Sequence, residues 1–149
     1  MRKTSLVLAI SSLALCAGMQ DPAAADRKAV ERAVLDYVEG IYDVKPEWIE
    51  RSVHPRLAKI GYARRGGDSY TEMVMSYEEL MRLAGSYNAQ GRVPADAPKQ
   101  VQVLDLLDQT ASAKLTAVWG IDYMHLAKFD GRWQIIQVLW QTPPPAGTN

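Results

Sequence analysis

The chain has 149 residues, of which 48% are hydrophobic and 23% are charged. This composition is that of one ordinary globular domain and excludes a disordered or fibrous chain. The 17 basic residues (Lys and Arg) equal the 17 acidic residues (Asp and Glu), so the formal net charge is zero. A neutral chain without a run of basic residues lacks the electrostatic footprint of nucleic-acid binding, so no DNA or RNA partner is expected.

Residues 1–25 are typical of a secretory signal peptide with a short leader. Arg2 and Lys3 precede an apolar run over residues 5–17, which is too short to span a bilayer stably. Small residues at the spacing that a signal peptidase reads place the mature start near Met19 or near Asp26, and both starts remain open. We therefore expect a secreted or periplasmic protein without a transmembrane segment.

Cys16 is the only cysteine, and it lies at the end of the apolar run. The residues up to it resemble the lipobox of bacterial lipoproteins, although Leu15 stands where that motif has a small residue. A cysteine that is discarded with the leader is the favoured interpretation, and a lipidated Cys16 is the alternative. If the leader is removed after Cys16, the mature chain has neither a disulfide nor a thiol nucleophile.

Two helices are expected ahead of residue 55. Asp21 is a favourable N-cap, and Pro22 suits the first position of a helix. Apolar residues over positions 30–42 then recur at helical spacing and form one stripe. Pro46 begins a short second helix, which ends at His54-Pro55 because the residue before a proline is pushed out of the helical region.

A hairpin and a third helix follow. Residues 57–62 and 70–75 have the composition of strands, and a glycine-containing turn at 64–69 joins them. Ser76, with Glu79 three residues later, forms a capping box that begins a helix ending before Gly91. Residues 88–99 show no periodicity and are expected to form a loop.

The last third of the chain is predicted to be strands. Alternating patterns occupy residues 100–107, 112–119, 121–129 and 133–141. Asp130-Gly131 is a strong signal for a two-residue hairpin, and Gly120 marks a bulge or a sharp bend. The prolines after Thr142 end the sheet, so residues 143–149 are expected to form a flexible tail.

This order of elements predicts an α+β fold. A curved antiparallel sheet wrapped on about three helices forms a cone that encloses a pocket. We find no internal repeat and no boundary within the remaining chain. A single domain over residues 26–142 is therefore expected.

Four segments together resemble a known family. They are residues 37–42, 53–57 and 111–115 and, as the most specific part, DYMHLAKFDGRWQII at 122–136. Over nearly all of residues 26–141 the chain resembles the putative lumazine-binding branch of the nuclear transport factor 2-like (SnoaL-like) superfamily. The resemblance implies a cone-shaped α+β fold, a pocket between helices and sheet, and commonly a homodimer formed by the outer sheet face.

The resemblance implies less about activity, because the superfamily includes ketosteroid isomerase, polyketide cyclases, dehydratases and non-enzymatic binding domains. The isomerase needs a carboxylate base and an oxyanion hole made of a tyrosine and a protonated aspartate. In this sequence the base aligns near Gly61-Tyr62, which has no carboxylate, and His125 aligns near the aspartate of the oxyanion hole. Tyr37 keeps the identity of the family's tyrosine.

The hairpin at Asp130-Gly131 predicts which residues share a face of the sheet. A two-residue turn pairs His125 with Ile136, Tyr123 with Val138 and Ile121 with Trp140. We expect this face to line the pocket because it gathers tyrosine, histidine and tryptophan. The opposite face is expected to form the dimer interface through Met124, Leu126 and Leu139, with Asp122 also pointing outward.

The expected pocket residues come from the first helix and from the strands. They are Tyr37, Ile41, Tyr62, Trp119, Tyr123, His125 and Trp140. In an enzyme, His125 would act as the base and Tyr37 as the oxyanion donor, whereas a histidine satisfied within the sheet is the structural alternative. Asp122 would be a candidate acid only if it were buried. Arg51 is expected on a solvated helix face.

Other chemistry finds no support in the pattern. The two histidines lack the spacing of a metal site, so neither a metal nor another cofactor is expected. Serine elbows and glycine-rich phosphate loops are also absent from the sequence. The preferred hypothesis is a secreted or periplasmic domain that binds a small hydrophobic or aromatic ligand. The alternatives are a small isomerase, lyase or dehydratase acting on a hydrophobic carbonyl compound, and a dimerisation module.

Overall fold

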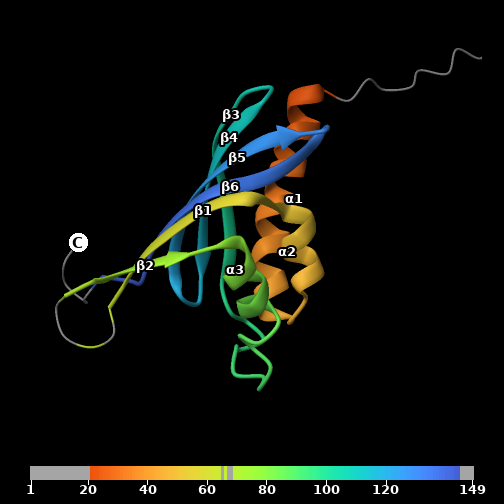
Figure 1. Cartoon of the computed structure of the whole chain (residues 1–149). Coiled ribbons are helices and arrows are strands. Elements are labelled where there is room, and N and C mark those ends of the chain that lie inside the picture. The colour runs from red at the N-terminus through yellow and green to blue at the C-terminus, as the bar shows by residue number, and fades with distance from the viewer. Residues whose placement is uncertain (1–20, 65, 67–68, 145–149) are drawn as a thin grey trace, which may run out of the picture.

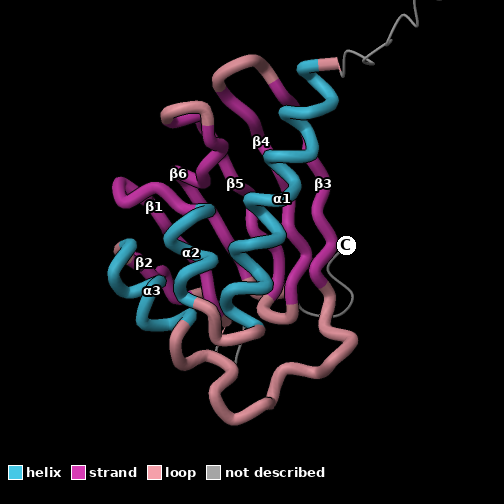
Figure 2. The backbone as a smooth tube through the Cα atoms, turned by 90° about the vertical axis from the view of Figure 1, so that its right-hand side faces the viewer, coloured by secondary structure: helices cyan, strands magenta, loops and turns pink. Residues whose placement is uncertain are grey.

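The computed structural model describes residues 21–64, 66 and 69–144. Its helices are α1 (Pro22–Tyr42), α2 (Pro46–Ser52) and α3 (Tyr77–Ala84), and its strands are β1 (Val53–Ala63), β2 (Thr71–Met75), β3 (Lys99–Leu106), β4 (Thr110–Ala117), β5 (Gly120–Phe129) and β6 (Arg132–Gln141). The helices lie together on one face of a single sheet, as Figures 1 and 2 show. The predicted α+β class is confirmed.

Parts of three predictions lie outside the described residues. They concern the signal peptide up to residue 20, the lipidation of Cys16 and the tail beyond residue 144. The helix α1 begins at Pro22, four residues before the expected start of the domain. In the described ranges, no helix is long and apolar enough to cross a membrane.

The six strands follow the order β2-β1-β6-β5-β4-β3. All neighbours are antiparallel except β1 and β6, which are parallel, so the sheet is mixed and not purely antiparallel as expected. The parallel pair arises because the chain leaves β2, crosses through α3 to the far edge at β3 and returns by hairpins. This path brings the last strand alongside β1 (Figure 1).

The predicted helix starts are confirmed in detail. The Asp21 carboxylate accepts a hydrogen bond from the Ala23 amide at 3.1 Å, with Pro22 at the first helical position. The side chains of Ser76 and Glu79 each accept from the other residue's amide, which completes the capping box.

Two boundaries differ from the prediction. The helix α3 ends at Ala84, well before Gly91. The strand β1 begins at Val53, so His54 and Pro55 lie in a strand and not at the end of a helix. A register shift between Val53 and Ala58 accommodates Pro55, which has no amide hydrogen to donate to a neighbouring strand.

The core lies between α1 and the inner face of the sheet, which is the face that the helices cover. The buried stripe of α1 includes the predicted apolar positions Val30, Val34, Val38 and Ile41. It packs with the buried strand residues Leu115, Met124, Leu126, Ile135 and Val138 in one cluster. Burial of this stripe drives α1 onto the sheet, because helices of ordinary propensity are held mainly by tertiary packing.

The register predicted for the hairpin of β5 and β6 is correct only near its turn. Leu126 pairs with Ile135 as the two-residue turn requires, but a bulge follows and His125 pairs with Gln137 instead of Ile136. Beyond the bulge, Tyr123 pairs with Leu139. The predicted pairs His125–Ile136, Tyr123–Val138 and Ile121–Trp140 are therefore wrong, because an extra residue in one strand regroups its side chains.

The predicted use of the two faces is also wrong. Met124 and Leu126 lie in the core and not at a dimer interface, whereas Tyr123, at 50% exposure, and His125 lie on the outer face. Alternation alone shows which residues of a strand share a face, but not which face the helices cover. Here α1 covers the face of Met124. Of the residues predicted for the dimer interface, Leu139 remains exposed.

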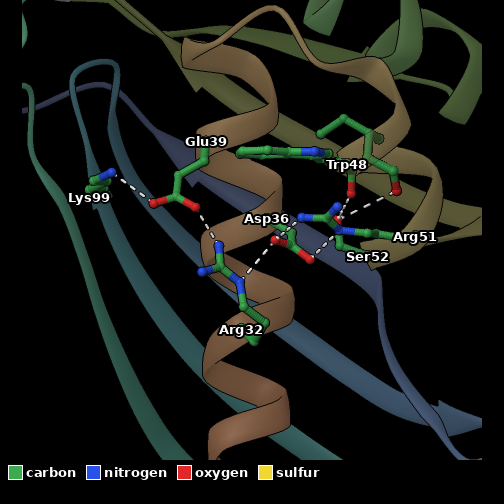
Figure 3. A network of polar contacts seen from close by, with 8 residues as sticks. Arg32, Asp36, Glu39, Trp48, Arg51, Ser52 and Lys99 are labelled. Carbon is green, nitrogen blue, oxygen red and sulfur yellow. Dashed lines mark hydrogen bonds and ion pairs between the residues drawn. The ribbon is translucent and has the colours of Figure 1, made fainter.

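A network of charged side chains joins α1 to α2 and β3 (Figure 3). The buried carboxylate of Asp36 accepts two hydrogen bonds from Arg51, each of 2.6 Å, and forms an ion pair with Arg32 at 2.9 Å. Glu39 contacts both Arg32 and Lys99. The prediction that Arg51 belongs to a solvated face is therefore incomplete, because its guanidinium neutralises a buried charge from α1.

Candidate ligand-binding site

A cavity of about 170 Å³ lies between the helical layer and one end of the sheet. Its walls come from α1, α3, β1, β2, β6 and the turn between β4 and β5. The aromatic lining residues are Tyr37, Tyr87, Trp119 and Trp140, and the aliphatic ones are Ile41, Met73, Met75 and Leu83. The charged lining residue is Lys59. An apolar concave site with a few polar groups is the usual form of a small-molecule site.

The structure brings together four of the residues that the sequence singled out for a pocket, namely Tyr37, Ile41, Trp119 and Trp140. The other three do not line this cavity. Tyr62 lies on the outer face, where its hydroxyl donates to Glu72 at 2.9 Å. Tyr123 and His125 are also on the outer face. There Nδ1 of His125 forms a hydrogen bond with Oε1 of Gln137 at 2.8 Å.

Trp119 is the centre of an aromatic cluster at the cavity. The rings of Tyr37, Tyr42 and Tyr87 approach it edge-on, at centroid distances of 6.3, 5.6 and 5.8 Å. This geometry is the one that aromatic quadrupoles favour. The indole nitrogen of Trp119 donates to Oδ1 of Asp122 at 2.9 Å, which holds the ring in place.

Asp122 is fully buried, with 0% of its surface exposed, on the inner face of β5. The prediction that it points outward is wrong, for the same reason as for Met124. Burial raises the pKa of its carboxyl above the ordinary value, and the charge of Lys59 opposes that shift. Asp122 is thus buried, which is the condition under which it was expected to be a candidate acid.

The sequence pattern did not single out Lys59. It lies on the inner face of β1 with 5% of its surface exposed, and its Nζ donates to the hydroxyl of Tyr37 at 2.7 Å. The same nitrogen lies 5.4 Å from the ring centre of Tyr37 and 5.5 Å from that of Trp140. The signal in the sequence that could have identified it is a lysine in the middle of a predicted strand. Its neighbours Ala58 and Ile60 lie on the outer face, so alternation places Lys59 on the inner face.

Burial also sets the protonation of the polar groups in this region. Burial removes water from the Lys59 amine and lowers its pKa to about 8. The negative charge of Asp122 raises this pKa, but by less than burial lowers it. Burial raises the pKa of the Tyr37 hydroxyl well above its usual range, and the nearby Asp122 charge raises it further. At neutral pH Tyr37 is therefore protonated, and a fraction of Lys59 is neutral.

Two buried polar atoms have no hydrogen-bond partner within the described residues, Oδ2 of Asp122 and Nε1 of Trp140. A buried donor without an acceptor costs free energy, on the order of 1–3 kcal/mol. Because Trp140 lines the cavity, a ligand that carries an acceptor atom could satisfy its indole N–H.

The catalytic pair proposed from the sequence does not form. Tyr37 reaches the cavity from α1 under the inner face, whereas His125 points to the opposite side of the sheet. The sheet therefore separates the two side chains, and they cannot act on one substrate within a monomer. In the part of the chain that the structure covers, no cluster of three or more His, Cys, Asp or Glu side chains could hold a metal ion.

A second depression, of about 580 Å³, lies on the surface near the β5–β6 turn. Its lining is largely polar and includes His54, Tyr77, Lys128 and Arg132. The ring of His54 stacks on Phe129 at a centroid distance of 4.0 Å, which explains a histidine at this position without a ligand.

Comparison with known proteins places this fold and cavity in a family. A family described as "Putative lumazine-binding" matches residues 25–141. The chain belongs to this family. The match covers α1 from residue 25 onward and all six strands, so every residue that lines the cavity of this putative lumazine-binding family member falls inside it. A search of curated proteins finds no match.

Solved structures show that this family member has the nuclear transport factor 2-like fold. A protein of this fold from Silicibacter pomeroyi shares 14% identity, covering 78% of this chain and 94% of its own, with a TM-score of 0.61. A protein of this fold from Methylobacillus flagellatus shares 15% identity, covering 80% of this chain and 93% of its own, with a TM-score of 0.60. A "Putative Scytalone Dehydratase" from Novosphingobium aromaticivorans shares 14% identity, covering 88% of this chain and 99% of its own, with a TM-score of 0.53. At these identities the likeness concerns the fold.

Proposed function

We propose that this chain binds one small aromatic or hydrophobic molecule in the cavity between α1, α3 and the sheet. The observation that carries the proposal is the apolar cavity itself, which is lined by Trp140, a residue whose buried indole N–H has no partner among the described residues. The family's description as lumazine-binding supports the same class of function.

The dimensions of the cavity limit the ligand. A volume of about 170 Å³ is close to that of engineered apolar cavities of about 150 Å³ that accept benzene. We therefore expect a ligand with a planar ring and an acceptor atom, which would lie toward Nε1 of Trp140 and Nζ of Lys59. The methionines of β2 are suited to adjust to different ring shapes.

A homodimer formed by the outer sheet face is part of this proposal. The register places Val74, Ile60, Leu139 and Tyr123 in one row across β2, β1, β6 and β5. All four side chains are exposed, Val74 to 73%. A continuous apolar row on a sheet without helices on that side is suited to cover the same row of a second copy.

Export to the periplasm or the medium is the third part of the proposal. Its support is the sequence of the first 17 residues, which combines a basic start with a short apolar run. Fractionation of the native host, followed by mass measurement of the mature chain, tests both export and the start of the mature protein.

Fewer observations support the alternative activity of an isomerase, lyase or dehydratase than support ligand binding. It rests on the polar residues Tyr37, Lys59 and Asp122 beside the cavity, and the Novosphingobium neighbour fits it only at the level of fold. Of the predicted pair His125 and Tyr37, only Tyr37 is among the residues that would carry such chemistry.

Native mass spectrometry of the protein purified from its own host tests ligand binding, together with titration by benzyl alcohol. We expect a small co-purifying mass, or a shift of the Trp140 indole N–H resonance on titration. Leu83→Trp fills the cavity and should abolish both signals, whereas Leu104→Trp on the exposed edge of β3 should preserve them. Thermal melting verifies that both variants fold. Wild-type protein that shows neither signal would contradict the proposal.

A further inference from the structure

Lys59 is a buried amine, and the buried carboxylate of Asp122 acts on its charge without touching it. No carboxylate within the described residues forms a direct ion pair with its Nζ, which donates to the neutral hydroxyl of Tyr37 at 2.7 Å. The nitrogen lies between two rings of the cavity wall, those of Tyr37 and Trp140. A lysine desolvated in an apolar pocket is the usual form of an amine nucleophile.

We propose that Lys59 is a covalent capture site for small aromatic aldehydes, which its amine binds inside the cavity as a Schiff base. This inference rests on the proposed ligand cavity and adds a reaction to it. The volume of about 170 Å³ accommodates a single aromatic ring with a formyl group and disfavours larger carbonyl compounds.

The reaction needs no reagent besides the aldehyde. The lone pair of neutral Nζ forms a bond to the carbonyl carbon, and the carbonyl oxygen becomes a hydroxyl by taking one hydrogen of the amine. The carbon–oxygen bond then breaks, and the oxygen leaves as water with the second amine hydrogen while nitrogen and carbon form a double bond. One water is released for each imine, and no electrons are gained or lost.

The neighbouring side chains are placed to assist both steps. The hydroxyl of Tyr37, 2.7 Å from Nζ, can pass a proton between the nitrogen and the departing oxygen. The indole N–H of Trp140, which has no partner among the described residues, can donate to the aldehyde oxygen. Because burial lowers the pKa of Lys59 to about 8, a larger part of the amine is neutral at pH 7 than for an exposed lysine.

Reductive trapping tests the proposal on the full chain. The protein is treated with benzaldehyde and cyanoborohydride, and peptide mapping locates the benzyl group. We expect trapping at Lys59 to be about tenfold or more faster than at Lys99, whose exposed ammonium pairs with Glu39. Without cyanoborohydride, the amount of imine at Lys59 should rise with pH and reach half its maximum near pH 8.

Two variants and a competitor complete the experiment. Lys59→Arg and Lys59→Met should both lose the fast adduct, whereas Lys99→Arg should retain it, and melting curves identify any variant that fails to fold. Benzyl alcohol, which cannot form an imine, should slow the trapping. Adducts spread over the exposed lysines at equal rates would overturn the proposal. If benzyl alcohol still binds in that case, the ligand-binding function stands; if it does not, both proposals fail.

Discussion

The Nζ atom of Lys59 and the hydroxyl oxygen of Tyr37 lie 2.7 Å apart and join the middle of β1 to the buried side of α1. Both side chains line the same cavity, so this hydrogen bond is part of its wall. It also links a group whose pKa burial lowers to one whose pKa burial raises. The pair therefore connects the packing of α1 on β1 to the protonation of the polar groups in the cavity.

Tyr37→Phe should destabilise the protein by about 1–3 kcal/mol, because the Lys59 amine loses its buried acceptor. Urea unfolding at neutral pH measures this change. Tyr62→Phe is the matched control, since the hydroxyl of Tyr62 contacts Glu72 at the exposed outer face. An equal loss of stability in the two variants would argue against a special role of the Tyr37 hydroxyl.

The stability of the protein should depend on the titration of Lys59. Its pKa is about 8 in the folded state and about 10.5 when exposed, so between these values the unfolded state binds more protons and stability rises with pH. The lowered pKa corresponds to a gain of about 2–3 kcal/mol across that window. The free energies of unfolding of wild type and Lys59→Met, measured near pH 8 and near pH 10.5, report this gain. Parallel curves for the two proteins would show that other groups carry the dependence.

Asp122→Asn should lower the pKa of Lys59 further, because the negative charge of Asp122 opposes the effect of burial. The amide oxygen of asparagine can still accept from Trp119, so the ring should remain in place. The pH midpoint of imine formation between benzaldehyde and Lys59 reports the change. Asp105→Asn, in the exposed strand β3, is the control and should leave the midpoint unmoved. A midpoint that rises in Asp122→Asn would refute this electrostatic coupling.

Gly61→Ala should displace Trp140 and reshape the cavity. A Cβ atom at position 61 would stand 1.9 Å from Cε2 of Trp140, so the indole ring must move. We expect a loss of about 1–3 kcal/mol in stability and weaker binding of benzyl alcohol. At Gly85 the nearest atoms to an added Cβ are 3.7 Å away, and Gly85→Ala should therefore be tolerated. Unchanged binding in Gly61→Ala would show that Trp140 does not shape the site.

Leu139→Glu should prevent self-association if the outer sheet face forms a dimer. The charge would stand in the middle of the apolar row, between Ile60 and Tyr123. Sedimentation at several concentrations should give a dimer for wild type and a monomer for the variant. Val118→Glu, at an exposed site in the β4–β5 turn, should remain dimeric. A wild-type protein that is monomeric throughout would end this part of the proposal.

The sequence by itself determined the features that depend on neighbouring residues. The Asp21-Pro22 start, the capping box of Ser76 and Glu79 and the turn at Asp130-Gly131 are short-range signals, and each occurs in the structure where it was predicted. The helical stripe of α1 likewise predicted which side of that helix is buried. These signals, with the motif at 122–136, were sufficient for the fold class and the family.

Only the tertiary structure decided which residues meet at the cavity. The bulge between the Leu126–Ile135 and His125–Gln137 pairs regroups the side chains of β6, and no local pattern announces it. The covered face of β5 depends on where α1 packs, which placed Asp122 inside and His125 outside. Lys59 became a site residue because a charged side chain in a strand can be buried when distant elements surround it, and its pKa follows from that burial.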